Sequence, residues 1–210
     1  MLNLAFLGPP GSGKGTQALI VSAKLKLDLV SMGDMLREEC ESGSVLGNEI
    51  NQLISKGNLV PIHIIKDMIH KKVKSADHGI LFDGIPRNID QAIFLDDALS
   101  DLKQKLSCVI EFQISSEDVI NRLKKRYICS DCSAILSIDN NDLACNKCGS
   151  FNIEKRDDDI SENAIQNRLQ IFGEESKKIL EFYAAKNILH KINADQNFND
   201  VTNSILSLIC

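Results

Sequence analysis

A glycine-rich stretch near the start of the chain carries the residues with the clearest chemistry, Gly8-Pro-Pro-Gly-Ser-Gly-Lys14-Gly-Thr16. It fits the pattern Gly-x-x-x-x-Gly-Lys, with Gly15 at the usual Ser or Thr position and Thr16 one residue later. Glycines let successive backbone N–H groups turn toward an anion, the next helix adds partial positive charge, and Lys14 supplies an ammonium group. The stretch therefore predicts a phosphate-binding loop, in preference to a glycine-rich turn that binds nothing.

An aspartate and an arginine follow a short apolar run within residues 79–88. The run at 80–82 predicts a buried strand, so Asp83 stands at its C-terminal end, where parallel α/β sheets bind ligands. A carboxylate near a phosphate loop can hold Mg²⁺ through water, although an aspartate in a turn or helix cap is the plain structural alternative. Arg87 follows a proline of fixed geometry and can donate two parallel hydrogen bonds to a phosphate.

Four of the seven cysteines form two C-x-x-C pairs, Cys129 with Cys132 and Cys145 with Cys148. Two such knuckles bring four thiolates around one ion, which predicts a closed structural Zn²⁺ site, although iron also accepts four thiolates. Two disulfides are the alternative, and a chain without a secretory signal makes them the weaker one. A lobe of roughly 30 residues has too little core to fold alone, so the metal would stabilise it.

Composition limits the classes of protein that the chain can belong to. Its 210 residues suffice for one sizeable core with small insertions, and 43% of them are apolar. A net charge of −5 argues against a protein that coats nucleic acid. No apolar run reaches the length of a membrane span, and no basic segment precedes the first apolar run, so we expect neither a membrane anchor nor a signal peptide.

Apolar periodicity predicts alternating strands and helices along the chain. The expected strands cover 2–7, 27–32, 80–82, 107–114 and 188–192. The expected helices cover 15–25, 34–41, 48–55, 62–74, 88–102, 116–126, 161–186 and 198–208. Gly43 and Gly47 are expected to break the chain between two of these helices. The alternation predicts an α/β fold with a doubly wound, five-stranded parallel sheet.

Two segments interrupt this alternation and are expected to form inserted lobes, one helical at 31–60 and one β-rich around the cysteines. Short β-like runs at 134–138 and 151–154 flank an expected hairpin turn at 139–142. Arg122 and Arg126 lie four residues apart, so a helix would present both on one face. A solvated charged face explains that pair taken alone, whereas the nearby motifs favour a functional role.

Taken together, these stretches resemble the adenylate kinase family, in its long bacterial form with a four-cysteine zinc-binding lid. The resemblance follows family order over nearly the whole chain. It rests on Gly8–Gln17, Ser31–Arg37, Asp83–Arg87, Gln91, Arg122, Arg126, the four clustered cysteines, Arg156–Asp159 and Arg168. The phosphate loop alone occurs in many NTPases, whereas the full set is specific. The segment between Cys132 and Cys145 is shorter than the family usually has.

The resemblance implies a P-loop NTPase-type core that reversibly transfers the γ-phosphoryl group of MgATP to AMP, giving two ADP. The core would comprise 1–30, 61–121 and 160–210, with an AMP-binding lobe at 31–60 and a zinc-bound lid at 122–159. We expect the lid to close over substrates and exclude water, and to open without them because Arg122, Arg126 and Arg156 repel one another. The expected partners are ATP, AMP and ADP, with no nucleic acid or membrane, and the expected state is a cytoplasmic monomer.

The resemblance also implies roles for individual residues. The expected ATP-binding residues are Gly11, Ser12, Gly13, Lys14, Gly15, Thr16, Arg122 and Arg126. The expected AMP-binding residues are Ser31, Arg37, Gly84, Arg87, Gln91 (at the adenine), Arg156 (with Lys155 as its alternative) and Arg168. The expected catalytic residues are Lys14, Asp83, Arg87, Arg122, Arg126, Arg156 and Arg168. The expected ions are Mg²⁺ with ATP and a structural Zn²⁺ on Cys129, Cys132, Cys145 and Cys148.

Three alternatives stay open. A UMP/CMP kinase of the same fold would differ in the base of its acceptor. A zinc-ribbon protein that binds nucleic acid would carry an inactive phosphate loop, against which the acidic net charge weighs. A switch that binds nucleotide without turnover would not need an acceptor site of the kind that Arg37, Arg87 and Gln91 would form.

Overall fold

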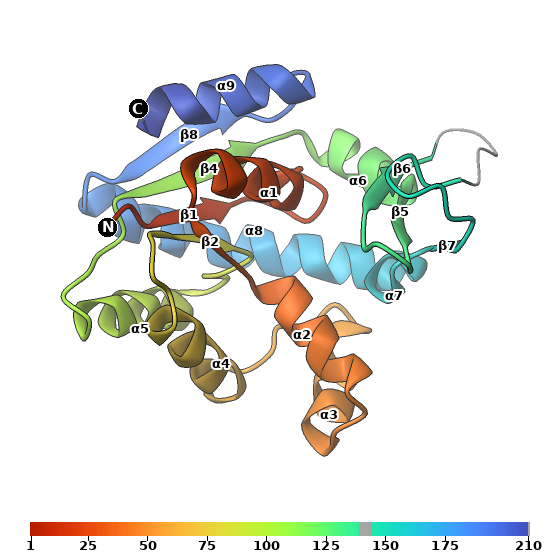
Figure 1. Ribbon diagram of the computed structural model, residues 1–210, viewed down its shortest axis with the longest axis horizontal. Helices are drawn as coiled ribbons and strands as arrows, with labels where there is room; N and C mark the ends of the chain where they lie inside the picture. The colour runs from red at the N-terminus through yellow and green to blue at the C-terminus, as the bar shows by residue number, and fades with distance from the viewer. Residues whose placement is uncertain (139–143, 210) are drawn as a thin grey trace.

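Five parallel strands form the central sheet of the computed structural model, which describes residues 1–138 and 144–209. The strands are β1 Leu4–Leu7, β2 Asp28–Ser31, β3 Ile80–Asp83, β4 Cys108–Gln113 and β8 Leu189–Asn193, in the spatial order β2-β3-β1-β4-β8 (Figure 1). β1 lies in the middle, where Ala5 is paired with Phe82 of β3 and with Val109 of β4. All of the predicted strands are confirmed, with ends that shift by one or two residues.

Helices cover both faces of this sheet (Figure 1). One face carries α1 Lys14–Leu25 and α9 Phe198–Ile209, and the other carries α4 Ile62–Lys74, α5 Ile89–Ser100 and α8 Glu162–Ala185. Side chains alternate along β1 and so reach both layers. Leu4 and Phe6 belong to the apolar cluster of α1 and α9, whereas Ala5 and Leu7 belong to the opposite cluster. The predicted doubly wound arrangement is confirmed.

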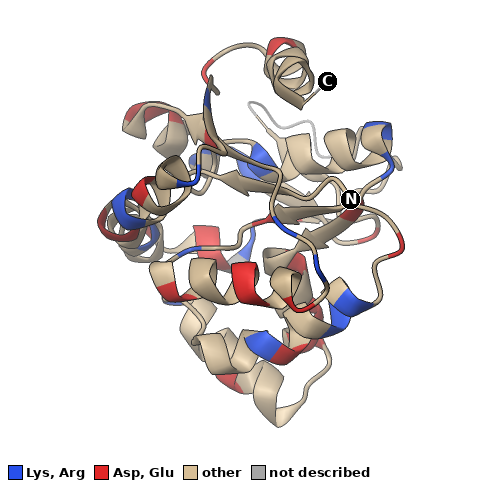
Figure 2. Cartoon of the chain, turned by 90° about the vertical axis from the view of Figure 1, so that its left-hand side faces the viewer, with Lys and Arg blue, Asp and Glu red and all other residues tan. Residues whose placement is uncertain are grey.

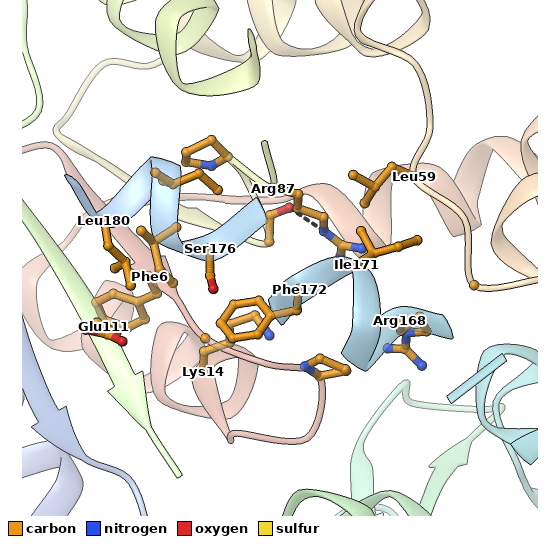
Figure 3. A pocket seen from close by; sticks show the side chains of 17 residues that line it. Phe6, Lys14, Leu59, Arg87, Glu111, Arg168, Ile171, Phe172, Ser176 and Leu180 are labelled. Carbon is orange, nitrogen blue, oxygen red and sulfur yellow. Dashed lines mark hydrogen bonds between the residues drawn. The ribbon is translucent and has the colours of Figure 1, made fainter. Parts of the chain in front are cut away.

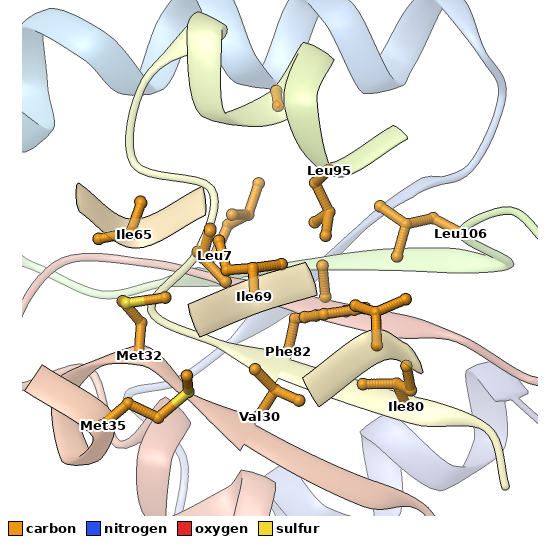
Figure 4. Packing of buried hydrophobic residues seen from close by; sticks show 14 of the residues in the cluster. Leu7, Val30, Met32, Met35, Ile65, Ile69, Ile80, Phe82, Leu95 and Leu106 are labelled. Carbon is orange, nitrogen blue, oxygen red and sulfur yellow. The ribbon is translucent and has the colours of Figure 1, made fainter. Parts of the chain in front are cut away.

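A helical lobe formed by α2 Met32–Glu41 and α3 Val45–Ile54 is continuous with the main core. Met32 and Met35 of α2 lie in the same apolar cluster as Phe82 of β3 and Leu95 of α5 (Figure 4). Ile50 of α3 is fully buried in that cluster as well. The burial of these side chains therefore stabilises the lobe and joins its apolar side chains to the core of the sheet.

Gly47 lies inside α3, which contradicts the prediction that it breaks a helix. α3 begins earlier than predicted because the Ser44 hydroxyl accepts a hydrogen bond from Gly47 N–H at 2.8 Å and caps the first turn. A Cβ atom at Gly47 would lie 2.2 Å from the backbone oxygen of Glu39 in α2. The missing side chain thus allows the two helices to touch. The other predicted break, Gly43, does lie between them.

A second, smaller sheet follows α6 Ser116–Lys124. Its antiparallel strands β5 Arg126–Cys129, β6 Ile135–Ser137 and β7 Ile153–Glu154 stand in the order β6-β5-β7, and α7 Asp157–Ile160 leads back to α8 (Figure 1). Its apolar cluster has Cys129, Leu136 and Cys145 as buried members. Both predicted β runs are confirmed, whereas the predicted hairpin turn at 139–142 lies outside the described residues.

Arg126 does not share a helix face with Arg122, contrary to the prediction. α6 ends at Lys124, and Arg126 is the first residue of β5. Pairing with β6, in which Arg126 lies opposite Ser137, draws the chain into an extended form directly after the helix. Charge spacing alone cannot detect such an end, since neither Gly nor Pro marks it.

Acidic and basic side chains are interspersed along the chain (Figure 2). Within residues 1–138 and 144–209, no helix combines the length and the apolarity that crossing a membrane requires. The arginines discussed below come from several elements and line one cavity.

Candidate active site

The glycine-rich loop connects β1 to α1, in the strand, loop and helix setting that the sequence predicts. Gly11 and Gly13 have φ angles of 82° and 88°, which glycine adopts with little strain. Gly13 is the N-cap of α1 and provides no side-chain cap, so the N–H groups of the first turn are available to an anion. The loop can therefore bind phosphate through its backbone.

Lys14 lies at the start of α1 and donates a hydrogen bond from Nζ to the backbone oxygen of Pro9 at 3.1 Å. Burial lowers the pKa of Lys14 to about 7, although the nearby Asp83 carboxylate acts to raise it. Arg87 and Arg168 add to the lowering by charge repulsion. Negatively charged phosphate oxygens beside this ammonium group would raise its pKa again and keep it protonated. The environment therefore favours Lys14 as a phosphate ligand.

Asp83 ends β3 and faces the same region. Its Oδ1 atom is buried and accepts no hydrogen bond, which is uncommon for a carboxylate oxygen. Burial raises the pKa of Asp83, and the charges of Lys14 and Arg87 oppose that rise. Water molecules bound to a Mg²⁺ ion would donate hydrogen bonds to this free carboxylate oxygen. The residues present therefore fit the expected ion.

Arg87 is held in place by its own loop. Its Nε donates to the backbone oxygen of Gly84 at 2.8 Å, and its backbone N–H donates to Oε1 of Gln91 at 2.8 Å. Gln91 is 3% exposed, and its backbone N–H is capped by Asn88. The side-chain oxygen of Gln91 thus supports the Arg87 turn, which the sequence did not indicate.

Three further arginines meet two aspartates where the small sheet joins the core. Arg126 donates to both oxygens of Asp159, at 2.6 and 2.7 Å, and Arg168 donates to Asp159 Oδ1 at 2.9 Å. Arg156 lies 3.2 Å and Arg168 3.1 Å from carboxylate oxygens of Asp158. Burial alone would raise the pKa of Asp158, but the charges of Arg156 and Arg168 lower it to about 2. Arg126 and Arg156 are therefore paired, and the repulsion expected between them is offset.

The two remaining arginines approach from other elements. Arg122 of α6 donates to the backbone oxygen of Ala194 at 2.9 Å and, at 3.5 Å, to that of Ser12 in the phosphate loop. Arg37 of α2 pairs with the exposed Asp34. Both side chains thus turn toward the phosphate loop or the opening beside it.

Most of the predicted site residues line one cavity of about 560 Å³. Its lining includes Gly11, Gly13, Lys14, Gly15, Thr16, Ser31, Arg37, Asp83, Gly84, Arg87, Arg122, Arg126, Arg156 and Arg168. Of the predicted nucleotide-binding and catalytic residues, two do not line it, the buried Ser12 and Gln91. Phe198 of α9 and Lys147, between the second pair of cysteines, also line it, although neither was singled out from the sequence.

Two smaller cavities extend this site. One of about 80 Å³ lies between the phosphate loop and α8, with Lys14, Arg87 and Arg168 beside Phe172 and Ser176 (Figure 3). The other, of about 360 Å³, separates the helical lobe from the small sheet and is lined by residues of both. The charged cavity is therefore open toward both lobes.

The four clustered cysteines converge in the small sheet. Their sulfur atoms all lie within 4.8 Å of one another, and Cys129–Cys148 and Cys132–Cys145 are each separated by 3.6 Å. Bonds of about 2.3 Å to a tetrahedral Zn²⁺ would place sulfur atoms roughly 3.8 Å apart, so the arrangement fits such an ion. The thiols are free, which contradicts the disulfide alternative in this structure. Backbone N–H groups of Cys148 and Lys147 lower the pKa of Cys145 to about 6, which favours its thiolate.

Known proteins are similar to this sequence over nearly its full length. The family model described as adenylate kinase matches residues 6–188. An adenylate kinase of Desulforamulus reducens is 39% identical over 210 residues, which cover 98% of each chain. Adenylate kinases of Methanocella arvoryzae and of a Wolbachia from Drosophila simulans are each 38% identical, over 99% and 98% of this chain and 98% and 97% of their own lengths.

Proposed function

The chain belongs to the adenylate kinase family, and on that premise we propose that its cavity binds MgATP and AMP and transfers the γ-phosphoryl group between them, giving two ADP. The observation that carries this function is the convergence of a phosphate loop, an unpaired carboxylate and arginines from several elements on one cavity. Phosphoryl transfer requires mainly positioning and positive charge around the moving group. This cavity has the residues for both.

The donor nucleotide would lie over the phosphate loop. Lys14 and the N–H groups of Gly11 to Thr16 would hold its phosphates, with Arg122 and Arg126 in the same cavity. Mg²⁺, when bound through water to Asp83, would neutralise charge on the β- and γ-phosphate oxygens. Asp83 suits that role because its buried Oδ1 has no other partner.

The acceptor nucleotide would lie toward the helical lobe. Arg37 and Arg87 are proposed to hold its phosphate, with Ser31 and Gly84 beside it. Gln91 is proposed to face the adenine, although it is buried and does not line the cavity in this structure. The amide NH₂ of Gln91 would serve this purpose, since its oxygen accepts from Arg87 N–H. The discriminating assay measures ADP formation from ATP with each of AMP, UMP, CMP and GMP. AMP should react fastest, and a faster reaction with UMP or CMP would indicate a pyrimidine kinase.

Arg126, Arg156 and Arg168 are proposed to surround the transferring group, where negative charge is spread over its oxygens.

The change Lys14→Ala tests the donor half of the site. It should lower kcat by about 100-fold or more while leaving the fold intact, because the ammonium group contacts the reacting phosphates. Turnover near the wild-type rate would contradict the assignment.

The small sheet at 122–159 is proposed to be a lid and the helical lobe at 31–60 to bind AMP, both attached to a core of 1–30, 61–121 and 160–210. A bisubstrate mimic, two adenosines joined by polyphosphate, should draw both inward. Labels at the exposed Phe151 and at Lys103 measure the lid, and labels at the exposed Val45 and at Lys103 measure the lobe. Both distances should shorten, the lid's by about ten ångströms. An unchanged lid distance would contradict closure, whatever the activity.

Zn²⁺ is proposed as a structural ion held by Cys129, Cys132, Cys145 and Cys148. With four thiolates as ligands, no position remains for water or substrate. Elemental analysis should find one zinc ion per chain. Iron in place of zinc would show that the bound metal is iron. We further propose a cytoplasmic monomer that acts on free nucleotides, since a net charge of −5 argues against a nucleic-acid partner. Sedimentation tests the monomer.

A further inference from the structure

Lys147, between the second pair of cysteines, is a cation without a partner at the wall of the large cavity. The residue is exposed, and among the described residues its ammonium group has neither an ion pair nor a hydrogen bond. The other lysine of the small sheet, Lys155, donates to the backbone oxygen of Lys124 at 2.9 Å and lies over the ring of Tyr127. The charge of Lys147 is therefore available to an anion in the cavity.

We propose that Lys147 is a further binding residue for the donor nucleotide, and that its ammonium group contacts the phosphate chain of that nucleotide. This inference rests on the function proposed above, in which the donor phosphates lie in the same cavity. It gives the second cysteine pair a part in substrate binding besides its part in holding an ion.

The turn that carries Lys147 has a well-defined backbone. The N–H groups of Lys147 and Cys148 donate hydrogen bonds to the sulfur atom of Cys145. Gly149 N–H donates to the backbone oxygen of Cys145, and Cys145 N–H donates to that of Ser150, both at 2.7 Å. These contacts hold the backbone of Lys147 in place, so only its side chain must lose freedom when a phosphate binds.

The cavities distinguish the two edges of the small sheet. β6 and β7 lie on either side of β5 (Figure 1). β6 and Lys147 line the large cavity but not the cavity toward the helical lobe, whereas Glu154 of β7 lines the latter and not the former. The phosphate loop also lines the large cavity and not the one toward the helical lobe. Lys147 therefore lies on the side of the donor.

The arginines of the cavity do not duplicate this charge. Arg126, Arg156 and Arg168 are each paired with a carboxylate of α7, so part of their charge is offset before any nucleotide binds. The ammonium group of Lys147 is not offset in this way. Its three N–H donors sit on a flexible stem, which lets the group adjust to the position of a phosphate oxygen.

A structural role in the metal site is the alternative explanation for Lys147. Four thiolates around a divalent ion leave a net negative charge, and Lys147 directly precedes Cys148. An ammonium group there would offset that charge. The two explanations predict different losses when Lys147 is changed, because the first affects the binding of nucleotide and the second affects the binding of metal.

The change Lys147→Gln tests the proposal, because it removes the charge and keeps most of the length of the side chain. In calorimetric titrations the Kd for MgATP should rise by about three- to fivefold, as expected when an exposed ion pair is lost. The Kd for AMP should change by less than about 1.5-fold, since Lys147 does not line the cavity toward the helical lobe. Unchanged MgATP binding, or equal losses for MgATP and AMP, would overturn the proposal.

The matched control is Asn146→Ala, which alters the same turn without changing a charge. Asn146 is exposed and lines none of the three cavities described above. Its Kd for MgATP should stay within about 1.5-fold of the wild-type value. Zinc affinity, measured by competition with a chelator, should stay within about threefold of the wild-type value in Lys147→Gln. A large loss of zinc affinity together with normal MgATP binding would assign Lys147 to the metal site and contradict the proposal.

Salt and a second variant show whether the contact is ionic. Because the Debye length is about 3 Å at 1 M salt, the difference between the wild type and Lys147→Gln should fall below about 1.5-fold there. Lys147→Arg keeps the charge and should bind MgATP within about twofold of the wild type at low salt. A difference that persists at 1 M salt would contradict an ionic contact. A wild-type protein that binds MgATP but forms no ADP with AMP would refute the kinase function and leave this binding test intact.

Discussion

The two lobes that flank the large cavity are held by different interactions. The helical lobe shares the main core, in which Met35 and Ile50 are buried together with residues of the sheet. The small sheet has its own cluster, of which two of the three buried members, Cys129 and Cys145, are also proposed metal ligands. One lobe is therefore an extension of the hydrophobic core, whereas the stability of the other is proposed to depend on an ion. Their stabilities should respond to different changes in conditions.

Metal removal should give the largest difference between the lobes. Structural Zn²⁺ contributes on the order of 10 kcal/mol to small domains of this kind, far more than a cluster of three buried side chains. Cys129→Ser, or a strong chelator, should unfold the small sheet and lower kcat strongly. Amide exchange should rise in β5 to β7 and stay unchanged in α2 and α3. Protection retained in β5 without metal would contradict this account.

The change Ile50→Ala should destabilise the main core. Ile50 is fully buried, so its truncation should lower the free energy of unfolding by about 2–5 kcal/mol. Leu136→Ala, in the small sheet, is the matched change. It should raise amide exchange in the sheet and leave the main unfolding transition, followed by calorimetry, nearly unmoved. Equal shifts of that transition would show that the two lobes are not independent.

Gly47→Ala tests how closely α2 and α3 pack. A Cβ atom there would lie 2.2 Å from the Glu39 oxygen, so the helices must separate, which should lower the free energy of unfolding by about 1–3 kcal/mol. Gly173→Ala is the control, because a Cβ there meets nothing within 4 Å and α8 is helical. It should stabilise the protein by about 0.5–1 kcal/mol. If both substitutions changed the free energy of unfolding in the same direction, the close approach of α2 and α3 would be contradicted.

Acid should affect the joint of the small sheet more than the helical lobe. The charges of Arg156 and Arg168 hold the pKa of Asp158 at about 2 in the folded protein, below its ordinary value of 3.8. Its contribution to stability is therefore complete above pH 3.8 and is lost as the pH falls toward 2, for a total of about 2 kcal/mol. Asp158→Asn should thus lower the free energy of unfolding at pH 6 and have little effect near pH 2. The deficit of Ile50→Ala should not change with pH, because no charge is lost.

Local patterns predicted more of this molecule than did single charges. The phosphate loop, the four cysteines and the strand before Asp83 were found because each motif lies within a short stretch of sequence. The hydrogen bonds between Arg126 and Asp159 were not predicted, since Asp159 lies 33 residues away and only the folded small sheet brings the two together. Asp158 and Asp159 were visible in the sequence, but their partners depend on where α6 ends.

Gly47 and Gln91 show a second limit of the sequence. A glycine between two helical patterns predicts a break, yet here its small size serves a helix contact that no local pattern records. Gln91 suggested a base-reading amide, and its oxygen proved to accept from Arg87 N–H. In both cases the course of the backbone brings in the neighbour that determines the residue's role. Residue type and spacing do not predict that neighbour.

The central position of β1 has a consequence for how the chain is made. β1 precedes its neighbours β3 and β4 in the chain, and they are completed only at Asp83 and Gln113. Residues up to Gln113 must therefore be synthesised before β1 is covered on both edges, and α9 must still close over α1. Until then the apolar strand Leu4–Leu7 stays accessible. The newborn chain thus passes through an interval in which its central strand lacks both of its partner strands.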